Sequence, residues 1–314
     1  MKSAVSRPEF HIEEVAFAHV EAKLWPNGPV CPHCKGMDRI GRLKGKTTRV
    51  GLCKCYACRK PFTVRMGTIF ESSHAPLHIW LQAIYLMCSS KKGISTRQLQ
   101  RTFGCSMKTA WFLGHRIRES MKETRDIFIP PLGGAGMTLE VDDTFVGGRA
   151  ENRAYGPIPP KPSVMALVER GGKVRSFHVP NVNAINLHPI IAKHANTDSR
   201  YQSDEARVYT GIDWNFAYQG AVNHSAKEYV RGDDYTNTVE GYFSILKRGI
   251  YGVYQHVSEA HLKRYLSEFD FRYSYRIKTG YDDAARAELA LKGAKDKRLM
   301  YRTVGRSRPA IWAA

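Results

Sequence analysis

The chain has 314 residues, of which 43% are apolar and 25% charged, a composition ordinary for a globular protein of two or three domains. Its 48 lysines and arginines exceed its 29 aspartates and glutamates, giving a formal net charge of +19. This surplus argues against an acidic disordered chain and against a small-molecule enzyme with a balanced surface. It favours a polyanionic partner, nucleic acid before an anionic membrane surface.

The charge is distributed unevenly along the chain. Residues 1–128 carry a net charge of +13, residues 129–275 are neutral, and residues 276–314 carry +6. This pattern predicts basic binding elements attached to a body that concentrates carboxylates. No secretion signal is expected, and the most apolar run, 77–88, is about half as long as a membrane-spanning helix.

The first predicted element is a zinc ribbon. Five of the seven cysteines lie within residues 31–58, and four of them form two Cys-x-x-Cys pairs separated by 20 residues, Cys31/Cys34 and Cys55/Cys58. Each pair makes a tight turn that directs two thiolates at one point, and together they complete a tetrahedral four-sulfur site for structural Zn²⁺. Chance thiols or a redox pair are the disfavoured alternative. Cys53 is interpreted as a spare thiol, and His33 is expected to point outward.

Residues 71–128 predict three helices. Apolar residues from Leu77 to Met87 follow helical spacing, and Ser95 and Ser106 are expected to cap two further helices on either side of a turn at Gly104. This is the outline of a helix-turn-helix DNA-binding unit; the alternative is a generic three-helix unit with a solvated basic face. The residues expected to contact DNA from the outer face of the last helix are Lys108, Thr109, His115, Arg116 and Lys122.

Residues 129–275 predict the order strand, strand, strand, helix, strand, helix. Asp142 falls in the first strand, Asp204 at the end of the fourth, and Glu240 in the last helix, beside an apolar stripe. This layout suggests an RNase H-like mixed sheet flanked by helices. Three such carboxylates can hold two Mg²⁺ (or Mn²⁺) ions about 3.5–4 Å apart, which suits phosphodiester chemistry. Lys247 and Arg248 are expected to pair with DNA phosphates.

The sequence resembles bacterial insertion-sequence transposases of the DDE superfamily, specifically the ISXO-like group with an N-terminal zinc ribbon. The resemblance covers nearly the whole chain and rests on CPHC, CYACRKPFTV, KKGISTRQLQRTFG, LEVDDTFVGG, SDEARVY and TNTVEGYFSILKRGIYGVY. It implies an RNase H-like core related to retroviral integrases. The residues it implies for the catalytic, magnesium-binding site are Asp142, Asp204 and Glu240, with Lys247 completing a DDEK signature and Asn237 as an alternative third ligand.

Three further positions match the family but are not assigned as primary site residues. The resemblance gives Asp143 a supporting role, and Tyr209 and His224 match recurrent positions to which we assign no role. A satisfied core histidine is the favoured interpretation of His224.

The resulting prediction is a DNA transposase of the bacterial cytoplasm. It would bind the terminal inverted repeats of its element, cleave at the element ends and join the 3′-OH ends to target DNA, as a homodimer or larger assembly on double-stranded DNA. The alternatives are a DNA-binding regulator with a non-catalytic RNase H-like domain and a nuclease without strand transfer. The expected segments are 1–70 (N-terminal helix and zinc ribbon), 71–128 (helix-turn-helix), 129–275 (catalytic domain) and 276–314, a basic tail that either clamps DNA or is a solvated, partly helical end.

Overall fold

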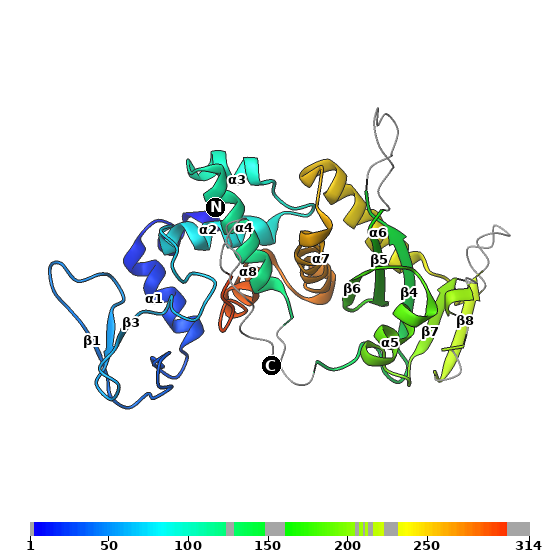
Figure 1. The fold of residues 1–314 in the computed structure, drawn as a ribbon, viewed down its shortest axis with the longest axis horizontal. Helices are drawn as coiled ribbons and strands as arrows, with labels where there is room; N and C mark the ends of the chain where they lie inside the picture. Colours follow the sequence, from blue (N-terminus) through cyan, green and yellow to red (C-terminus); the bar gives the residue numbers. More distant parts are fainter. Residues whose placement is uncertain are drawn as a thin grey trace, which may run out of the picture.

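The fold is given by a computed structural model of the chain, shown in Figure 1. It describes residues 3–123, 129–147, 161–204, 207–209, 211–212, 216–222 and 232–299. A small ribbon and a helical unit lie on one side, and a mixed sheet with helices on both faces lies on the other (Figure 1). None of the described helices is both long enough and apolar enough to cross a membrane.

The described chain contains eight α-helices, five short helical turns and eight strands. The helices are α1 (Glu13–Leu24), α2 (Leu77–Ser89), α3 (Thr96–Phe103), α4 (Met107–Met121), α5 (Ala184–His194), α6 (Asn237–Gly249), α7 (Glu259–Ser274) and α8 (Asp283–Lys292). Short helical turns are η1 (Ala4–Ser6), η2 (Pro8–Phe10), η3 (Arg207–Tyr209), the π-helical η6 (Ile250–Tyr254) and η7 (Ile277–Thr279). The strands are β1 (Ile40–Arg42), β2 (Cys53–Cys55), β3 (Pro61–Phe62), β4 (Thr138–Phe145), β5 (Ser163–Glu169), β6 (Val174–Val179), β7 (Arg200–Asp204) and β8 (Tyr218–Val222).

The ribbon is a three-stranded antiparallel sheet in the order β1-β2-β3. It is attached to α1 at Gly51, whose φ is +72° and whose absent Cβ would lie 2.3 Å from the ring of Phe17. Only glycine combines this left-handed backbone with so close an approach. The contact holds the ribbon against the helical unit.

The helical unit is built from α1, α2, α3, α4 and α8. Both predicted caps are confirmed: the Ser95 hydroxyl accepts a hydrogen bond from the backbone of Gln98, and that of Ser106 accepts one from Thr109, each over 3.1 Å. The predicted inward face of α4 is also confirmed. Its four residues are buried: Ala110, Leu113, Ile117 and Met121.

The C-terminal segment is partly helical, as one of the two alternatives expected, but its helix is packed into a core and not solvated on all sides. Helix α8 packs against α2, and its Ala290 and Leu291 are buried in the same core as residues of α1 and α2. These few apolar side chains lie among charged ones, so the charge of the segment conceals their helical spacing. Residues 300–314 lie outside the described part of the chain.

The central sheet has five strands in the order β6-β5-β4-β7-β8. Strand β4 is antiparallel to β5 and parallel to β7, while β5/β6 is antiparallel and β7/β8 parallel. The predicted strands and the helix over 184–194 are confirmed. Strand β8, which lies at the edge beside β7, was not predicted.

Alternate residues of the strands face opposite layers of helix. Val164, Ala166 and Val168 of β5 pack with α6 and α7 in one core. Val141 of β4 faces the other core, which includes Leu187 of α5. Residues 140 and 142 of β4 pair with residues 168 and 166 of β5, and they therefore face α6.

A buried carboxylate joins the sheet to the start of α6. The Glu140 side chain is fully buried and accepts hydrogen bonds from the backbone N–H groups of Thr238 (2.7 Å) and Val239 (3.0 Å) and from the Thr238 hydroxyl (2.8 Å). Arg170 donates to the same carboxylate at 2.5 Å and stacks on the ring of Tyr235. The first N–H groups of a helix lack intrahelical partners and favour an anion, so Glu140 takes the place of a side-chain cap that Thr236 does not provide.

Helix α7 is shared between the sheet and the helical unit. Its Leu266 and Phe269 pack beneath the sheet, while Phe271 belongs to the core of the helical unit. A buried ion pair strengthens the joint, since Arg118 of α4 donates to Glu268 of α7 over 2.7 Å. The two units are thus packed around one helix.

Replacing Glu140 with glutamine is expected to destabilise the protein by about 3 kcal/mol, because the amide cannot accept every hydrogen bond and leaves the Arg170 charge without its anion. Urea unfolding followed by circular dichroism would measure this. Glu259→Gln is the matched control, since that side chain is 67% exposed. An equal loss in the two variants would contradict the role of Glu140.

Candidate functional site

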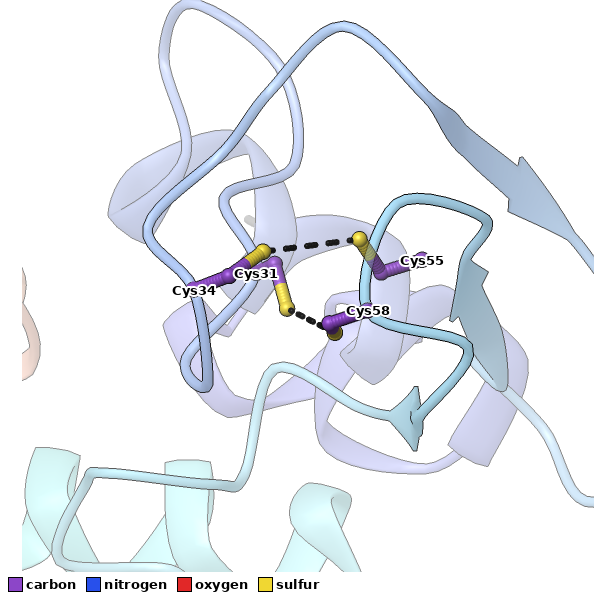
Figure 2. A group of neighbouring side chains, drawn as sticks. All are labelled: Cys31, Cys34, Cys55 and Cys58. Atoms are coloured by element: carbon purple, nitrogen blue, oxygen red, sulfur yellow. Dashed lines mark hydrogen bonds between the residues drawn. The ribbon is translucent and has the colours of Figure 1, made fainter.

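Four cysteines of the ribbon form a metal-binding cluster. The sulfur atoms of Cys31, Cys34, Cys55 and Cys58 all lie within 4.8 Å of one another. The Cys31–Cys58 and Cys34–Cys55 sulfur pairs, joined by dashed lines in Figure 2, are each 3.6 Å apart. A tetrahedral zinc ion with Zn–S bonds of 2.3 Å requires sulfurs about 3.8 Å apart. The cluster therefore fits structural Zn²⁺, as the spacing predicts.

The two Cys-x-x-Cys turns share one backbone conformation. Lys35 and Arg59, which directly follow Cys34 and Cys58, both have a φ of +61°. In the first turn the N–H of Cys31 donates to the Gly36 carbonyl, and in the second the N–H of Cys55 donates to the equivalent Lys60 carbonyl. These turns direct the four sulfurs to one point, while exposed His33 lies outside the cluster. Burial raises the pKa of the Cys53 thiol, which is not part of the cluster, in agreement with its interpretation as a spare thiol.

A second candidate site lies where β4 and β7 end beside α6. Asp142 and Asp204 each stand two residues beyond Glu140 and Gln202, which are direct partners in the parallel pair. Asp142 and Glu240 line an open groove of about 700 Å³, which we call the carboxylate groove. Its lining residues are Asp142, Thr144, Glu240, Phe243, Ser244, Lys247, Arg248, Tyr251 and Gly252.

The groove concentrates negative charge. Burial first, and then the carboxylates of Asp204, Asp143 and Glu240, together raise the pKa of Asp142 to about 7. The Asp143 N–H, which donates to Asp142 over 2.7 Å, opposes this shift. Mutual repulsion of this kind is relieved by a bound cation. Oxygen ligands of this type are those that Mg²⁺ prefers. Among the described residues, however, only the four cysteines are gathered closely enough for one ion.

Asp143 faces the opposite layer. Its carboxylate accepts a hydrogen bond from the Tyr209 hydroxyl at 2.8 Å, and Tyr209 is buried in the core on the α5 side of the sheet. Burial raises the pKa of both groups. The two residues fasten the end of β4 to η3 and give Tyr209 a structural explanation.

The α6 residues divide between the groove and its surroundings. Half-buried Lys247 and exposed Arg248 line the groove, whereas Asn237, one turn before Glu240, does not. Sequence reasoning missed Tyr251, whose hydroxyl donates to the Gly147 carbonyl over 3.1 Å and accepts from its N–H over 3.2 Å. The sequence does contain a signal for Tyr251. Residues 240, 244, 247 and 251 follow helical spacing, which places position 251 on the same helix face as Glu240 and Lys247.

The predicted DNA-contacting face of α4 needs correction at two positions. Lys108, Thr109 and Lys122 are exposed as expected. His115 is fully buried beside Trp111 and Tyr265, and Arg116 is 3% exposed.

The cause is the packing of α4 on both sides. The Arg116 guanidinium donates to the carbonyls of Ile69, Glu71 and Leu299, so it holds these two segments of the chain against α4. Helix α7 covers the His115 side, which an amphipathic pattern within α4 alone does not reveal. His224 lies outside the described residues.

Comparison with known families identifies both parts of the chain. A family model described as an ISXO2-like transposase domain matches residues 131–274, and one described as a transposase zinc-ribbon domain matches residues 12–61. The first covers the sheet and its helices, and the second covers α1 and the four cysteines.

Two relatives point the same way. The chain is 28% identical over 281 residues to an uncharacterized protein in transposable element ISH50 of Halobacterium salinarum, covering 83% of this chain and 91% of the relative. It is 28% identical over 102 residues to an uncharacterized transposase-like protein of Haemophilus influenzae, covering 32% of this chain and 81% of that protein.

The purified protein is expected to contain one zinc ion per chain, and Cys31→Ser should lose it, because three remaining thiolates leave the tetrahedral site incomplete. Cys53→Ser is the matched control and should retain the metal. Elemental analysis of both variants after dialysis measures the content. Loss of zinc from Cys53→Ser with retention in Cys31→Ser would contradict the ligand set.

Buried His115 is expected to make stability depend on pH. Burial and nearby Arg118 lower its pKa from 6.5 to about 2, so the folded protein holds it neutral while the unfolded chain takes up a proton below pH 6.5. Its contribution is complete above pH 6.5 and is lost as the pH falls, by up to about 1.4 kcal/mol per pH unit.

His115→Phe should therefore lose less stability than the wild type between pH 7.5 and 5.5 in urea titrations. Exposed His74 supplies the control, His74→Gln, which should behave like the wild type. A His115→Phe variant with the wild-type pH dependence would disprove this assignment.

Proposed function

The chain belongs to the ISXO2-like transposases with an N-terminal zinc ribbon, and from this we propose that it is a DDE-type, Mg²⁺-dependent DNA transposase. The observation that carries the proposal is the meeting of Asp142 and Glu240 in one groove with Lys247, next to the strand end that bears Asp204. The sheet order, with three antiparallel strands followed by two parallel ones, supports an RNase H-like interpretation of this domain.

The acidic and the basic residues of this site have different roles in phosphodiester cleavage. Asp142, Asp204 and Glu240 would hold the Mg²⁺ ions, which supply charge stabilisation and an activated oxygen nucleophile when bound. Lys247 and Arg248 bind the scissile phosphate from the α6 side and offset the charge that accumulates on it. Tyr251 holds the end of β4 in place beside them.

Two successive reactions use this arrangement. In the first, water attacks the phosphorus at the element end, the P–O3′ bond breaks, and a free 3′-OH is left. In the second, that 3′-OH attacks a target phosphodiester, and the target 3′-oxygen leaves with a proton. Both reactions are in-line displacements at phosphorus, so the same carboxylates serve both.

The basic N-terminal half supplies DNA binding in this proposal. Residues 1–128 carry a net charge of +13, and Lys108, Thr109 and Lys122 of the α3–α4 helix-turn-helix are exposed to contact phosphates and base edges. Two element ends must be held together for joining, which favours a homodimer or larger assembly. The protein would act on the DNA of the bacterial cytoplasm.

The two rival functions leave different products. A DNA-binding regulator would bind element ends without Mg²⁺-dependent cleavage, and the presence of all three acids with Lys247 argues against it. A nuclease would release cleaved ends but join none. An assay that resolves bound, cleaved and joined DNA separates the three.

Asp142→Asn is expected to reduce cleavage and joining of end-containing DNA by at least about 1000-fold, because removal of one carboxylate weakens the hold on the cation that offsets developing charge. Binding of the same DNA should remain within a factor of about two. Exposed Asp198→Asn is the matched control and should cleave normally. Normal strand transfer by Asp142→Asn would refute the mechanism.

The same assay decides the third acid. Glu240→Gln should be as inactive as Asp142→Asn, whereas Asn237→Ala should retain most activity, because Glu240 lines the groove and Asn237 does not. The reverse ranking would assign the role to Asn237.

A further inference from the structure

A second cavity, lined mainly by basic residues, lies on another side of α6 from the carboxylate groove. It has a volume of about 400 Å³ and is formed where the end of α2, helices α6 and α7, and the start of α8 meet. We call it the arginine pocket. Its lining residues are Cys88, Ser89, Ser90, Lys91, Ile245, Phe269, Arg272, Tyr273, Arg276, Ile277, Lys278, Asp283 and Arg286.

The pocket carries an excess of positive charge. Five of its lining residues are basic and one, Asp283, is acidic. Asp283 is already paired with Arg286. Lys91 and Lys278 are exposed at the rim, whereas Arg272 and Arg286 are buried at 7% and 8% exposure.

Two buried guanidinium groups have donors without acceptors. In the part of the chain that the structure describes, Arg272 Nε and Nη2 and Arg286 Nε have no hydrogen-bond partner. The remaining Arg272 nitrogen, Nη1, donates to Glu268, which is shared with Arg118. Buried charged donors left unpaired are costly, so their persistence beside a cavity points to a ligand that accepts hydrogen bonds.

We propose that the arginine pocket binds a phosphate group, and specifically a backbone phosphate of the DNA on which the proposed transposase acts. Guanidinium groups match phosphate oxygens in geometry and charge. Water can satisfy single donors, but five cations face one carboxylate in the lining, and Glu268, outside the lining, is shared between Arg272 and Arg118, so the charge balance favours an anion. A cavity of this size also admits the sugar attached to the phosphate.

The location gives the bound phosphate a purpose. The pocket lies where the helical unit meets the sheet, with α2 and α8 on one side and α6 and α7 on the other. A strand held there is fixed relative to both units. The pocket would thus anchor DNA between its recognition and its cleavage, an inference that rests on the proposed function.

The test removes the rim charges and leaves the buried arginines in place. Lys91→Gln/Lys278→Gln takes away two exposed cations, and Lys173→Gln/Lys193→Gln, exposed and outside the pocket, removes the same charge elsewhere. Inorganic phosphate, compared with chloride at equal ionic strength, should raise the Tm of the wild type and of the control by about 3 °C and that of the rim variant by much less.

A second arm identifies the source of the phosphate. The affinity for an end-containing duplex is measured against salt concentration, without Mg²⁺. The rim variant should show a log–log slope reduced by about 1 to 2 relative to the control variant.

Each result has one meaning. A phosphate effect with an unchanged DNA slope would replace the DNA backbone by a free phosphate or nucleotide as the occupant. Equal phosphate and chloride effects together with equal slopes would overturn the site. Neither arm depends on cleavage, so a failure of the proposed catalytic function would be seen separately with Asp142→Asn.

Discussion

The buried carboxylate of Glu140 joins the two elements, β4 and α6, that carry the acidic residues of the groove. This side chain fixes the first N–H groups of α6 to β4, and Arg170 neutralises its charge. Asp142 lies two residues further along the same strand and the same face, while Glu240 lies within the first turn of the helix. Because a strand and a helix are both stiff, one anchoring point sets the distance between the two carboxylates and directs Lys247 into the same groove.

The carboxylate groove and the arginine pocket have opposite charges. The carboxylate groove gathers acids that repel one another, so it favours a cation. The arginine pocket gathers five cations, two of which keep guanidinium donors without acceptors, so it favours an anion. Residues of α6 line both sites. The neutrality of residues 129–275 conceals the acidic site, whereas four of the five cations of the arginine pocket, Lys91, Arg276, Lys278 and Arg286, come from the basic segments on either side of that domain.

Much of this architecture could be predicted from local sequence patterns. The spacing of the cysteines, the caps Ser95 and Ser106 and the strands of the sheet depend on residues close together in the chain, and the structure confirms them. Strand β8 and the burial of His115 and Arg116 depend on neighbours far away in sequence, which local periodicity does not reveal. Glu140 was overlooked beside Asp142 and Asp143 because all three look alike in LEVDD, and only the helix that covers one face distinguishes them. The roles of Asp142, Asp204 and Glu240 remain predictions.

The packing of α8 against α1 and α2 has a consequence for how the protein is made. The core of the helical unit contains Phe17, Trp80 and Leu291, so the first and last described helices complete one another. During synthesis α1 and α2 emerge from the ribosome long before α8. Part of their apolar surface stays exposed to solvent until α8 has been translated. The sheet domain, which carries the carboxylates, is translated between α4 and α8. A nascent chain therefore completes its helical unit only after that domain has been synthesised.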